Sequence, residues 1–304
     1  MSARDEPAAA GSARRLRIAT RMCLLGLAWA CEREPRDIAR EPAAEIAGAQ
    51  LPARIVSLAP SVTEVLFAVG AGERVVGVDA FSDHPAAARR LPKLGGLLDP
   101  DVEGMLRLRP DLVVLLPAQE EIGQALRQAG VPTLAVPHEE LRDVSAAVRM
   151  VGARVGRRAA AAALADSLAR ALDRERVRRP EEHRPRVLFV VAREPGQVAR
   201  FTAAGPRTYI GELIELAGGR NALDPGPVRY PQLSAESALR LGPDVLLEWS
   251  GEDAAGGAAE DWERLEHLAA VRNGRVHVLR DEVWLRPGPR VVEALMRLKP
   301  LLRP

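Results

Sequence analysis

The stretch Asp101-Val-Glu-Gly-Met-Leu-Arg-Leu-Arg-Pro-Asp-Leu-Val-Val-Leu115 recurs later in the chain as Ser234-Ala-Glu-Ser-Ala-Leu-Arg-Leu-Gly-Pro-Asp-Val-Leu-Leu247. Six of the nine positions from Glu103 to Asp111 match their counterparts. In each copy a capping residue precedes a short helix with leucine on one face, a proline ends the helix, and an apolar run follows. We therefore predict two copies of one α/β unit. A repeat this long indicates two lobes with a cleft between them, rather than a solenoid.

The rest of the chain supports an α/β fold in both lobes. Apolar runs that do not alternate, as a parallel sheet covered on both faces requires, occur at 54–59, 75–78, 112–116, 133–136, 186–191 and 275–279. Further helices are expected at 62–69, 120–129, 208–217, 262–268 and from 288 onward. Ser61 and Glu64 have the spacing of a capping box that would open the first of these helices.

The segment from Leu141 to Arg179 has a helical apolar stripe with an interruption at Gly156. Its second part, 157–178, would span about 33 Å as a helix. We expect this helix to join the two lobes as a stiff connector, which makes a large hinge closure unfavourable.

These patterns divide the chain into consecutive segments. We predict an export signal at 1–30, a flexible tether at 31–52, an N-terminal α/β lobe at 53–140, a helical connector at 141–180 and a C-terminal α/β lobe at 181–304. The Gly-rich insert at 251–259 is expected to be a surface loop.

The first thirty residues have the pattern of an export signal. Four arginines between Arg14 and Arg21 precede a nine-residue apolar region, Met22 to Ala30, which is too short to span a bilayer in the mature protein. The end of this region together with the next residue, Leu27-Ala-Trp-Ala-Cys31, resembles a bacterial lipoprotein signal, although Ala28 stands where such signals usually have leucine. We expect Cys31 to carry a lipid anchor, with simple cleavage into the periplasm as the alternative.

Composition excludes several classes of function. The net charge is +2, and because the first thirty residues carry +3, the remainder has no basic field for nucleic acid. Both cysteines, Cys23 and Cys31, precede the predicted lobes in the sequence, so the lobes can form neither a disulfide nor a thiolate metal site. The five histidines lack metal-ligand spacing, and the common catalytic motifs are missing. We expect no enzyme activity, no cofactor and no resident metal.

Five stretches carry a resemblance to a known family: Arg54 to Glu64, Gly77 to Pro85, Glu103 to Asp111, Gly211 to Asn221, and Tyr230 to Glu236. They resemble the bacterial periplasmic binding proteins of the cobalamin, ferric-siderophore and haem importers, over about residues 53 to 304. The resemblance implies two Rossmann-like lobes joined by a single long α-helix, with the ligand in the cleft between them. It also implies a monomer that delivers this small molecule to the permease and ATPase of an ABC transporter.

In this family an acidic residue on each lobe pairs with arginines of the permease. The matching positions are Glu103 and Glu236, which are also the two glutamates that the repeat makes equivalent. A helix-start glutamate can also be present only for its favourable interaction with the helix dipole, worth about 0.3–1 kcal/mol.

The resemblance implies a ligand site built from aromatic side chains. Similar cobalamin binders hold the corrin between aromatic rings, and the matching positions are Phe81, Phe201 and Tyr230, with Trp284 in a nearby loop. Phe201 and Trp284 could instead fill the core. Ser61, Leu97 and Arg286 complete the expected ligand-binding set. Leu97 stands where cobalamin binders often have tryptophan and haem binders a tyrosine, so haem is disfavoured unless His84 or Tyr230 supplies the iron ligand.

The expected function is therefore capture of cobalamin or a related corrinoid for an ABC importer. A ferric siderophore is the alternative, since its negative charge would suit the loop arginines Arg193, Arg200, Arg207, Arg229 and Arg286. An envelope enzyme or a ligand sensor on the same scaffold is a further alternative.

Overall fold

The computed structural model describes residues 50–97, 99–251 and 258–303. The expected export signal, the tether before Gln50, Cys31 and the centre of the Gly-rich insert, 252–257, lie outside the described residues. The helices of the described part are all too short or too polar to cross a membrane.

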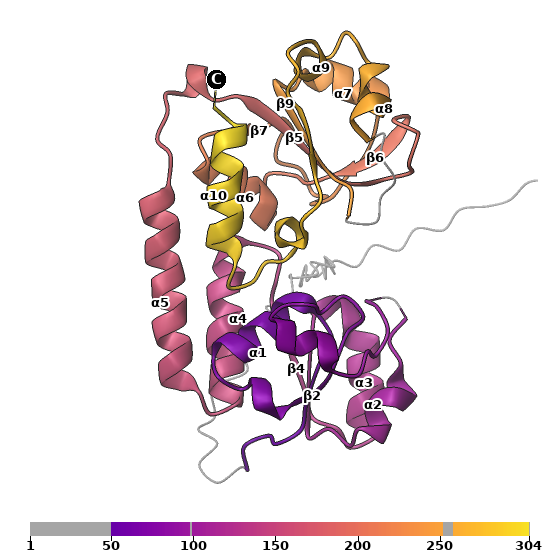
Figure 1. The fold of residues 1–304 in the computed structure, drawn as a ribbon, viewed down its shortest axis with the longest axis vertical. Coiled ribbons are helices and arrows are strands. Elements are labelled where there is room, and N and C mark those ends of the chain that lie inside the picture. The colour runs from indigo at the N-terminus through magenta and orange to yellow at the C-terminus, as the bar shows by residue number, and fades with distance from the viewer. Residues whose placement is uncertain (1–49, 98, 252–257, 304) are drawn as a thin grey trace, which may run out of the picture. The chain divides into compact units, whose positions relative to one another are not determined.

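The first lobe is a parallel sheet with the strand order β2-β1-β3-β4 (Figure 1). Its strands are β1 (Ile55–Ser57), β2 (Val75–Val78), β3 (Leu112–Leu115) and β4 (Thr133–Ala135). Its helices are α1 (Pro60–Ala68), α2 (Val102–Arg107) and α3 (Glu120–Gln128). Successive residues of a strand point to opposite faces, so Leu112 and Val114 join the core under α1, while Val113 and Leu115 join the core under α2 and α3. The predicted coverage of both faces is confirmed.

The start of α1 differs from the predicted capping box. The N-cap residue is Ala59, which has no side chain to cap the helix, and Pro60 occupies the first helical turn. Glu64 is 3% exposed and forms an ion pair with Arg290 of the second lobe instead, Oε1–Nη2 2.7 Å. The predicted capping box is wrong, because the helix begins before Ser61, and the Glu64 carboxylate pairs with a cation 226 residues away.

The connector is a pair of helices, α4 (Leu141–Arg154) and α5 (Arg158–Glu175), joined by a tight turn at Gly156. Arg74 of the first lobe donates to the carbonyl of Val155 at this turn, 2.8 Å. At the other end of α5, Lys299 of the second lobe donates to Glu175, 2.7 Å. Helix α4 also runs between the lobes, because at its start Leu141 N donates to Glu212 of the second lobe, 2.9 Å, so the connector is a pair of helices where a single long helix was expected (Figure 1).

The second lobe contains a mixed sheet with the strand order β10-β9-β5-β6-β8. The strands are β5 (Arg186–Arg193), β6 (Arg200–Ala203), β7 (Arg220–Asn221), β8 (Gln232–Ser234), β9 (Val245–Trp249) and β10 (Val276–Leu279). The helices are α6 (Tyr209–Leu216), α7 (Ala235–Leu241), α8 (Ala258–Glu263), α9 (Ala269–Arg272) and α10 (Val291–Leu301). The strands β10, β9 and β5 are parallel, β6 pairs antiparallel with β5, and β8 pairs antiparallel with β6. The helix predicted at 262–268 is wrong, because the chain turns there between α8 and α9.

The sequence repeat corresponds to a structural repeat. Asp101 caps α2 by accepting from Gly104 N, 2.7 Å, and Ser234 caps α7 by accepting from Ser237 N, 3.3 Å. The repeated aspartates also have one role: Asp111 accepts from Arg54 N at the start of the first lobe's sheet, 2.9 Å, and Asp244 accepts from Arg186 N, 2.8 Å. Each Pro-Asp pair thus joins its helix–strand unit to the first strand of its own lobe.

The two lobes share one apolar core. A single cluster of buried residues runs from α1 through the connector helices to α6 and α10, and includes Leu66, Val151, Leu168, Ile214 and Leu295. Separating the lobes would expose this apolar surface to water, at a free-energy cost of about 25 cal/mol per Å². The stiffness of the connector stays a prediction.

Candidate functional site

A cavity of about 410 Å³ lies between the two lobes. Its lining combines apolar side chains with a few polar ones: Leu58, Ala59, Pro60, Ser61, Asp79, Phe81, Leu97, Leu116, His138, Trp249, Glu282, Leu285, Arg286 and Pro287. A concave, mostly apolar site with a small number of placed polar groups is what a small-molecule binder presents.

The cavity lies at the carboxyl ends of parallel strands. Leu58 follows β1, Asp79 follows β2, Leu116 follows β3, and Trp249 ends β9. Ligands of open α/β sheets bind at this edge. Leu116 and Trp249 occupy equivalent positions in the sequence repeat. The duplicated unit therefore contributes one apolar side chain from each lobe to the same cavity.

The residues at the mouth of the cavity are exposed apolar side chains. Phe81 is 61% exposed and Leu97 is 44% exposed, and both belong to the lining. A ligand that covered them would remove this apolar surface from water, which is favourable. Phe81, Leu97 and Ser61 line the cavity, and their role in ligand binding stays a prediction.

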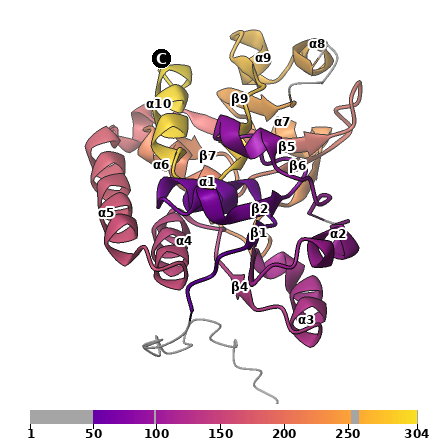
Figure 2. The ribbon, with the colours of Figure 1, turned by 60° about the horizontal axis from the view of Figure 1, so that its bottom comes forward.

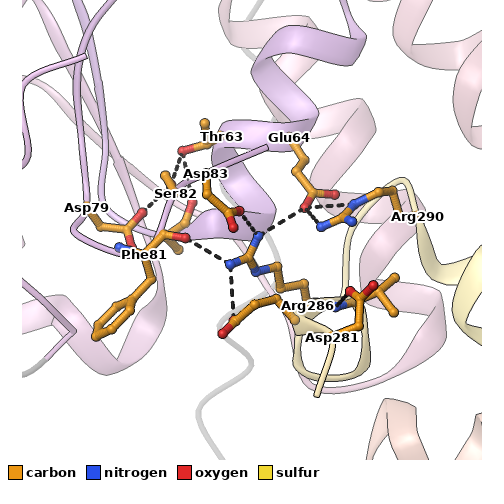
Figure 3. A network of polar contacts seen from close by, with 12 residues as sticks. Thr63, Glu64, Asp79, Phe81, Ser82, Asp83, Asp281, Arg286 and Arg290 are labelled. Atoms are coloured by element: carbon orange, nitrogen blue, oxygen red, sulfur yellow. Dashed lines mark hydrogen bonds and ion pairs between the residues drawn. The ribbon is translucent and has the colours of Figure 1, made fainter. Parts of the chain in front are cut away.

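Beneath Phe81 lies a buried polar cluster of the first lobe (Figure 3). Asp79 is 3% exposed and accepts from the Phe81 N–H, 3.0 Å, and from the Ser82 hydroxyl. The Ser82 and Thr63 hydroxyls share a hydrogen bond, 2.7 Å. Burial raises the pKa of Asp79, and the hydrogen bonds from Ser82 and Phe81 oppose this shift.

Arg286 of the second lobe reaches into the first lobe beside this cluster (Figure 3). Its side chain is 4% exposed; it donates to the Phe81 carbonyl, 2.9 Å, to Glu282, 3.1 Å, and to Asp83. Burial alone would raise the pKa of Asp83, but the hydrogen bond and charge of Arg286 outweigh it and lower that pKa. The two terminal nitrogens of the guanidinium therefore already have acceptors within the protein, whereas its Nε is buried without a hydrogen-bond partner among the described residues.

Two of the expected cleft aromatics are in the core. Phe201 is 1% exposed and packs edge-on against Trp262, with ring centroids 5.3 Å apart. Trp284 is 6% exposed, belongs to the main core, and its carbonyl accepts from the Tyr209 hydroxyl, 2.7 Å. The prediction that these rings line the cleft is wrong, because strand β6 and the turn after β10 direct them inward.

Tyr230 is half-buried, packs against the main core, and does not line the cavity. Burial raises its pKa. His84 is exposed and also lies outside the lining. Neither residue is therefore placed to ligate an iron in the cavity.

The loop arginines are also arranged differently from the expectation. Of Arg193, Arg200, Arg207, Arg229 and Arg286, Arg286 alone belongs to the described lining of the cavity. Arg193 is buried between Glu248 and Asp261 on the far side of β9, and Arg229 contacts Glu139 and Glu140. The cationic cleft that a siderophore would favour is not formed by these side chains.

Sequence reasoning missed Trp249 and His138. Trp249 could have been found by comparing the repeat with itself, since it is the counterpart of Leu116 at a strand end. His138 follows β4, and burial lowers its pKa. A neutral imidazole therefore lies in the cavity wall. Within the described residues, no group of three or more His, Cys, Asp or Glu side chains could hold a metal ion.

Glu103 and Glu236 lie outside the cavity, on the surface of their lobes. Each is in the first turn of its helix, α2 or α7. The Glu103 side chain is 91% exposed, and Glu236 is exposed. Hydrogen bonding to Ser234 lowers the pKa of Glu236, so its carboxylate is charged at neutral pH.

Comparisons with known proteins agree with this geometry. The family model described as periplasmic binding protein matches residues 55–283. The vitamin B12-binding protein of Vibrio parahaemolyticus is 26% identical over 247 residues, covering 81% of this chain and 87% of the relative. The uncharacterized ABC transporter substrate-binding lipoprotein YvrC of Bacillus subtilis is 26% identical over 261 residues, covering 83% and 81%. The solved structure of the periplasmic heme-binding protein RhuT from Roseiflexus sp. RS-1 has a TM-score of 0.71 and 32% identity, covering 82% and 97%.

Proposed function

Since the chain belongs to the periplasmic binding protein family, as the substrate-binding component of an ABC importer, we propose that its cargo is cobalamin or a related corrinoid. The observation that supports this choice is that each lobe contributes an aromatic ring, Phe81 from the first and Trp249 from the second, to a cavity whose lining is mostly apolar. Such a lining suits a large, flat ligand that is held by burial of apolar surface.

An anionic ferric siderophore has less support. Arg286, the arginine in the described lining, already faces Asp83 and Glu282, with Glu64 at 3.9 Å. Because one guanidinium already faces three carboxylates, burying a further anion beside it would add a negative charge that no cation there balances, which is costly.

Haem is the second candidate, and His138 is the observation that favours it. The imidazole lies in the cavity wall with its pKa lowered by burial, so it is in the neutral form that ligates iron. One similar solved structure is a heme-binding protein.

The test is a titration of the purified protein with cyanocobalamin, haem and ferric chelates, followed by calorimetry and visible absorbance. We expect saturable one-to-one binding of cyanocobalamin. If haem or a ferric chelate binds and cyanocobalamin gives no heat, the corrinoid proposal is overturned. Recovery of the ligand unchanged after prolonged incubation separates a carrier from an enzyme.

Delivery requires contact with the permease, and the proposed docking residues are Glu103 and Glu236. Their support is their exposure and their equivalence in the repeat. Each carboxylate would pair with a permease arginine, and because exposed ion pairs contribute only about 0.2–1 kcal/mol, the pairs set orientation more than affinity.

We also propose that the protein is exported and anchored to the cell envelope through Cys31, as a monomer. The support is the sequence around Cys31 and the similarity to a lipoprotein. In cell fractionation we expect the protein with the membranes and the Cys31→Ser variant in the soluble envelope fraction. Equal soluble amounts of both would rule out the lipid anchor.

A further inference from the structure

A second cavity, of about 400 Å³, lies outside the cleft between the lobes. It is formed where the first turns of α4 and the last turns of α5 meet α6 of the second lobe, and its described lining shares no residue with the cavity that contains Phe81. Helices α4 and α5 lie side by side, with α6 next to the start of α4 (Figure 1; Figure 2). The volume lies in the range of small-molecule sites, about 300–1,000 Å³.

The lining of this second cavity combines apolar side chains with charged ones. Its apolar residues are Leu141, Ala169, Leu172 and Leu216. Among its acids, Asp173 has Arg176 at 3.8 Å, and Glu215 is hydrogen-bonded to Arg184. Glu212 has no such partner among the described residues, and its Oε2 accepts only a backbone hydrogen bond, from Leu141 N at 2.9 Å. The cavity therefore contains one half-buried carboxylate without a cation.

Glu212 has a counterpart in the first lobe, Glu64. Helices α1 and α6 both end at a glycine with positive φ, Gly70 at 79° and Gly218 at 83°. Each glutamate lies six residues before the glycine of its helix. Each also contacts the start of a helix that comes from elsewhere in the chain, α10 for Glu64 and α4 for Glu212. The surroundings of Glu64 therefore indicate what kind of group suits Glu212.

The two glutamates differ in the charge that faces them. Arg290, the N-cap residue of α10, donates to Glu64 Oε1 through Nε, 3.1 Å, and through Nη2, 2.7 Å. The N-cap residue of α4 is instead an acid, Glu140, which pairs with the 80% exposed side chain of Arg142, 2.7 Å. Burial, and to a smaller extent the charge of Glu140, raise the pKa of Glu212. A positive charge beside Glu212 is therefore favoured.

We infer that this cavity binds a small organic cation, with a planar amidinium or guanidinium head on the Glu212 carboxylate and an apolar body against Leu172 and Leu216. The head corresponds to the guanidinium of Arg290 beside Glu64. A planar cation with several N–H groups forms strong, charge-assisted hydrogen bonds with a carboxylate. The apolar body removes the surface of the half-buried Leu172 from water, which is favourable.

The charges of the lining favour a cation over an anion. The described lining contains the carboxylates of Asp173, Glu212 and Glu215 and the guanidiniums of Arg142 and Arg176. An anion would add to this excess of negative charge, whereas a cation reduces it. Because the cavity is separate from the cleft between the lobes, this inference goes beyond the proposed function and does not depend on the identity of the cargo.

The experiment titrates the purified protein with three probes of one shape, followed by saturation-transfer difference NMR. Benzamidine is the cation, benzamide is its neutral counterpart and benzoate is the anion. We expect saturable binding of benzamidine, with a Kd at least tenfold lower than that of benzamide or benzoate. Equal binding of the three probes would overturn the role of charge.

Two variants locate the site. Glu212→Gln removes the charge and retains an oxygen that can accept from Leu141 N, and we expect it to raise the Kd for benzamidine at least tenfold. Ala169→Trp, at an exposed position of α5, fills the cavity and should also raise this Kd at least tenfold. The matched control is Glu121→Gln, which changes an exposed acid of α3 without an ion pair among the described residues, and it should leave the Kd unchanged.

Urea unfolding shows whether each variant is folded, and if one variant is not, the other decides. The inference is overturned if wild type shows no saturable binding of benzamidine, or if a folded Glu212→Gln or Ala169→Trp variant binds it as tightly as wild type does. Neither result changes the proposed function, because the titration with cyanocobalamin tests a different cavity.

Discussion

Arg286 of the second lobe donates a hydrogen bond to the backbone carbonyl of Phe81 in the first lobe, Nη2–O 2.9 Å. Phe81 contributes an exposed ring to the mouth of the cavity, whereas Arg286 is 4% exposed. A buried cation of one lobe thus fixes the backbone under a ligand-facing ring of the other.

Replacing Arg286 by alanine should destabilise the protein. The change leaves carboxylates at the lobe junction without their cation, and breaking a buried pair from one side costs about 3–5 kcal/mol. Urea unfolding measures the loss. Arg297→Ala is the control, because Arg297 pairs with Asp281 and Glu293 at about 40% exposure of each side chain, where a loss below about 1 kcal/mol is expected. Equal losses in the two variants would show that the Arg286 network does not hold the lobes.

Phe81→Ala and Phe201→Ala should have opposite effects. Phe81 is 61% exposed, so its removal should leave unfolding unchanged and weaken ligand binding about ten- to hundredfold, as expected for loss of one buried ring. Phe201 is 1% exposed, so its removal should cost about 3–5 kcal/mol of folding stability. Calorimetric titration and urea unfolding of both variants provide the comparison. Normal stability of Phe201→Ala would contradict its place in the core.

The repeat explains why so much of the fold could be predicted from the sequence. Asp101 and Ser234 act as caps as expected, and the strands predicted near 55, 75, 112, 133, 186 and 275 are present, because these features depend on neighbouring residues. The Ser61–Glu64 capping box was predicted wrongly because α1 begins at Pro60, before Ser61, and the true partner of Glu64, Arg290, is distant in sequence. The same holds for 262–268, where the turn after α8 is fixed by the packing of Trp262 against Phe201.

The stability of wild type relative to Asp79→Asn should depend on pH. Burial raises the pKa of Asp79 above its ordinary value of 3.8, so the folded protein holds this proton more tightly than the unfolded chain does. The stability from this site is therefore complete below the ordinary pKa and is lost as the pH rises through the folded pKa.

Urea unfolding at several values between about pH 4 and pH 7 tests this prediction. The difference in unfolding free energy, wild type minus Asp79→Asn, should decrease as the pH rises. The asparagine can still accept from the Phe81 N–H, and its amide can donate to the Ser82 hydroxyl. A difference that does not change with pH, or that increases, would refute the assigned direction of the shift.

Exchanging Glu103 and Glu236 together for alanine should spare ligand binding and abolish transport. Both side chains are exposed, and neither belongs to the cavity lining. Ligand affinity is measured by titration, and uptake by radiolabelled ligand in reconstituted vesicles. The neighbouring exposed pair Glu120→Ala/Glu121→Ala on α3 is the control, for which normal uptake is expected. Normal uptake by the Glu103/Glu236 variant would exclude the docking role.

The ligand site was harder to predict than the fold, for a physical reason. Phe81 and Leu97 lie in turns, and for them the chain direction and the family resemblance were enough to predict that they line the cavity. Phe201 and Trp249 are both large aromatics near strand ends, and their opposite placement depends on which sheet face each residue occupies. That choice follows from the pairing of β5, β6 and β9, which brings distant segments together.

The shared core of the lobes and the connector has a mechanical consequence. Two lobes that share an apolar core do not separate through thermal motion alone, because separation would expose to water the apolar contacts that run through Val151 and Leu295. Under the proposed function, release of the ligand would then need work that the transporter supplies. The same rigid packing would keep the ligand bound until the transporter acts, so the transporter would set the time of release.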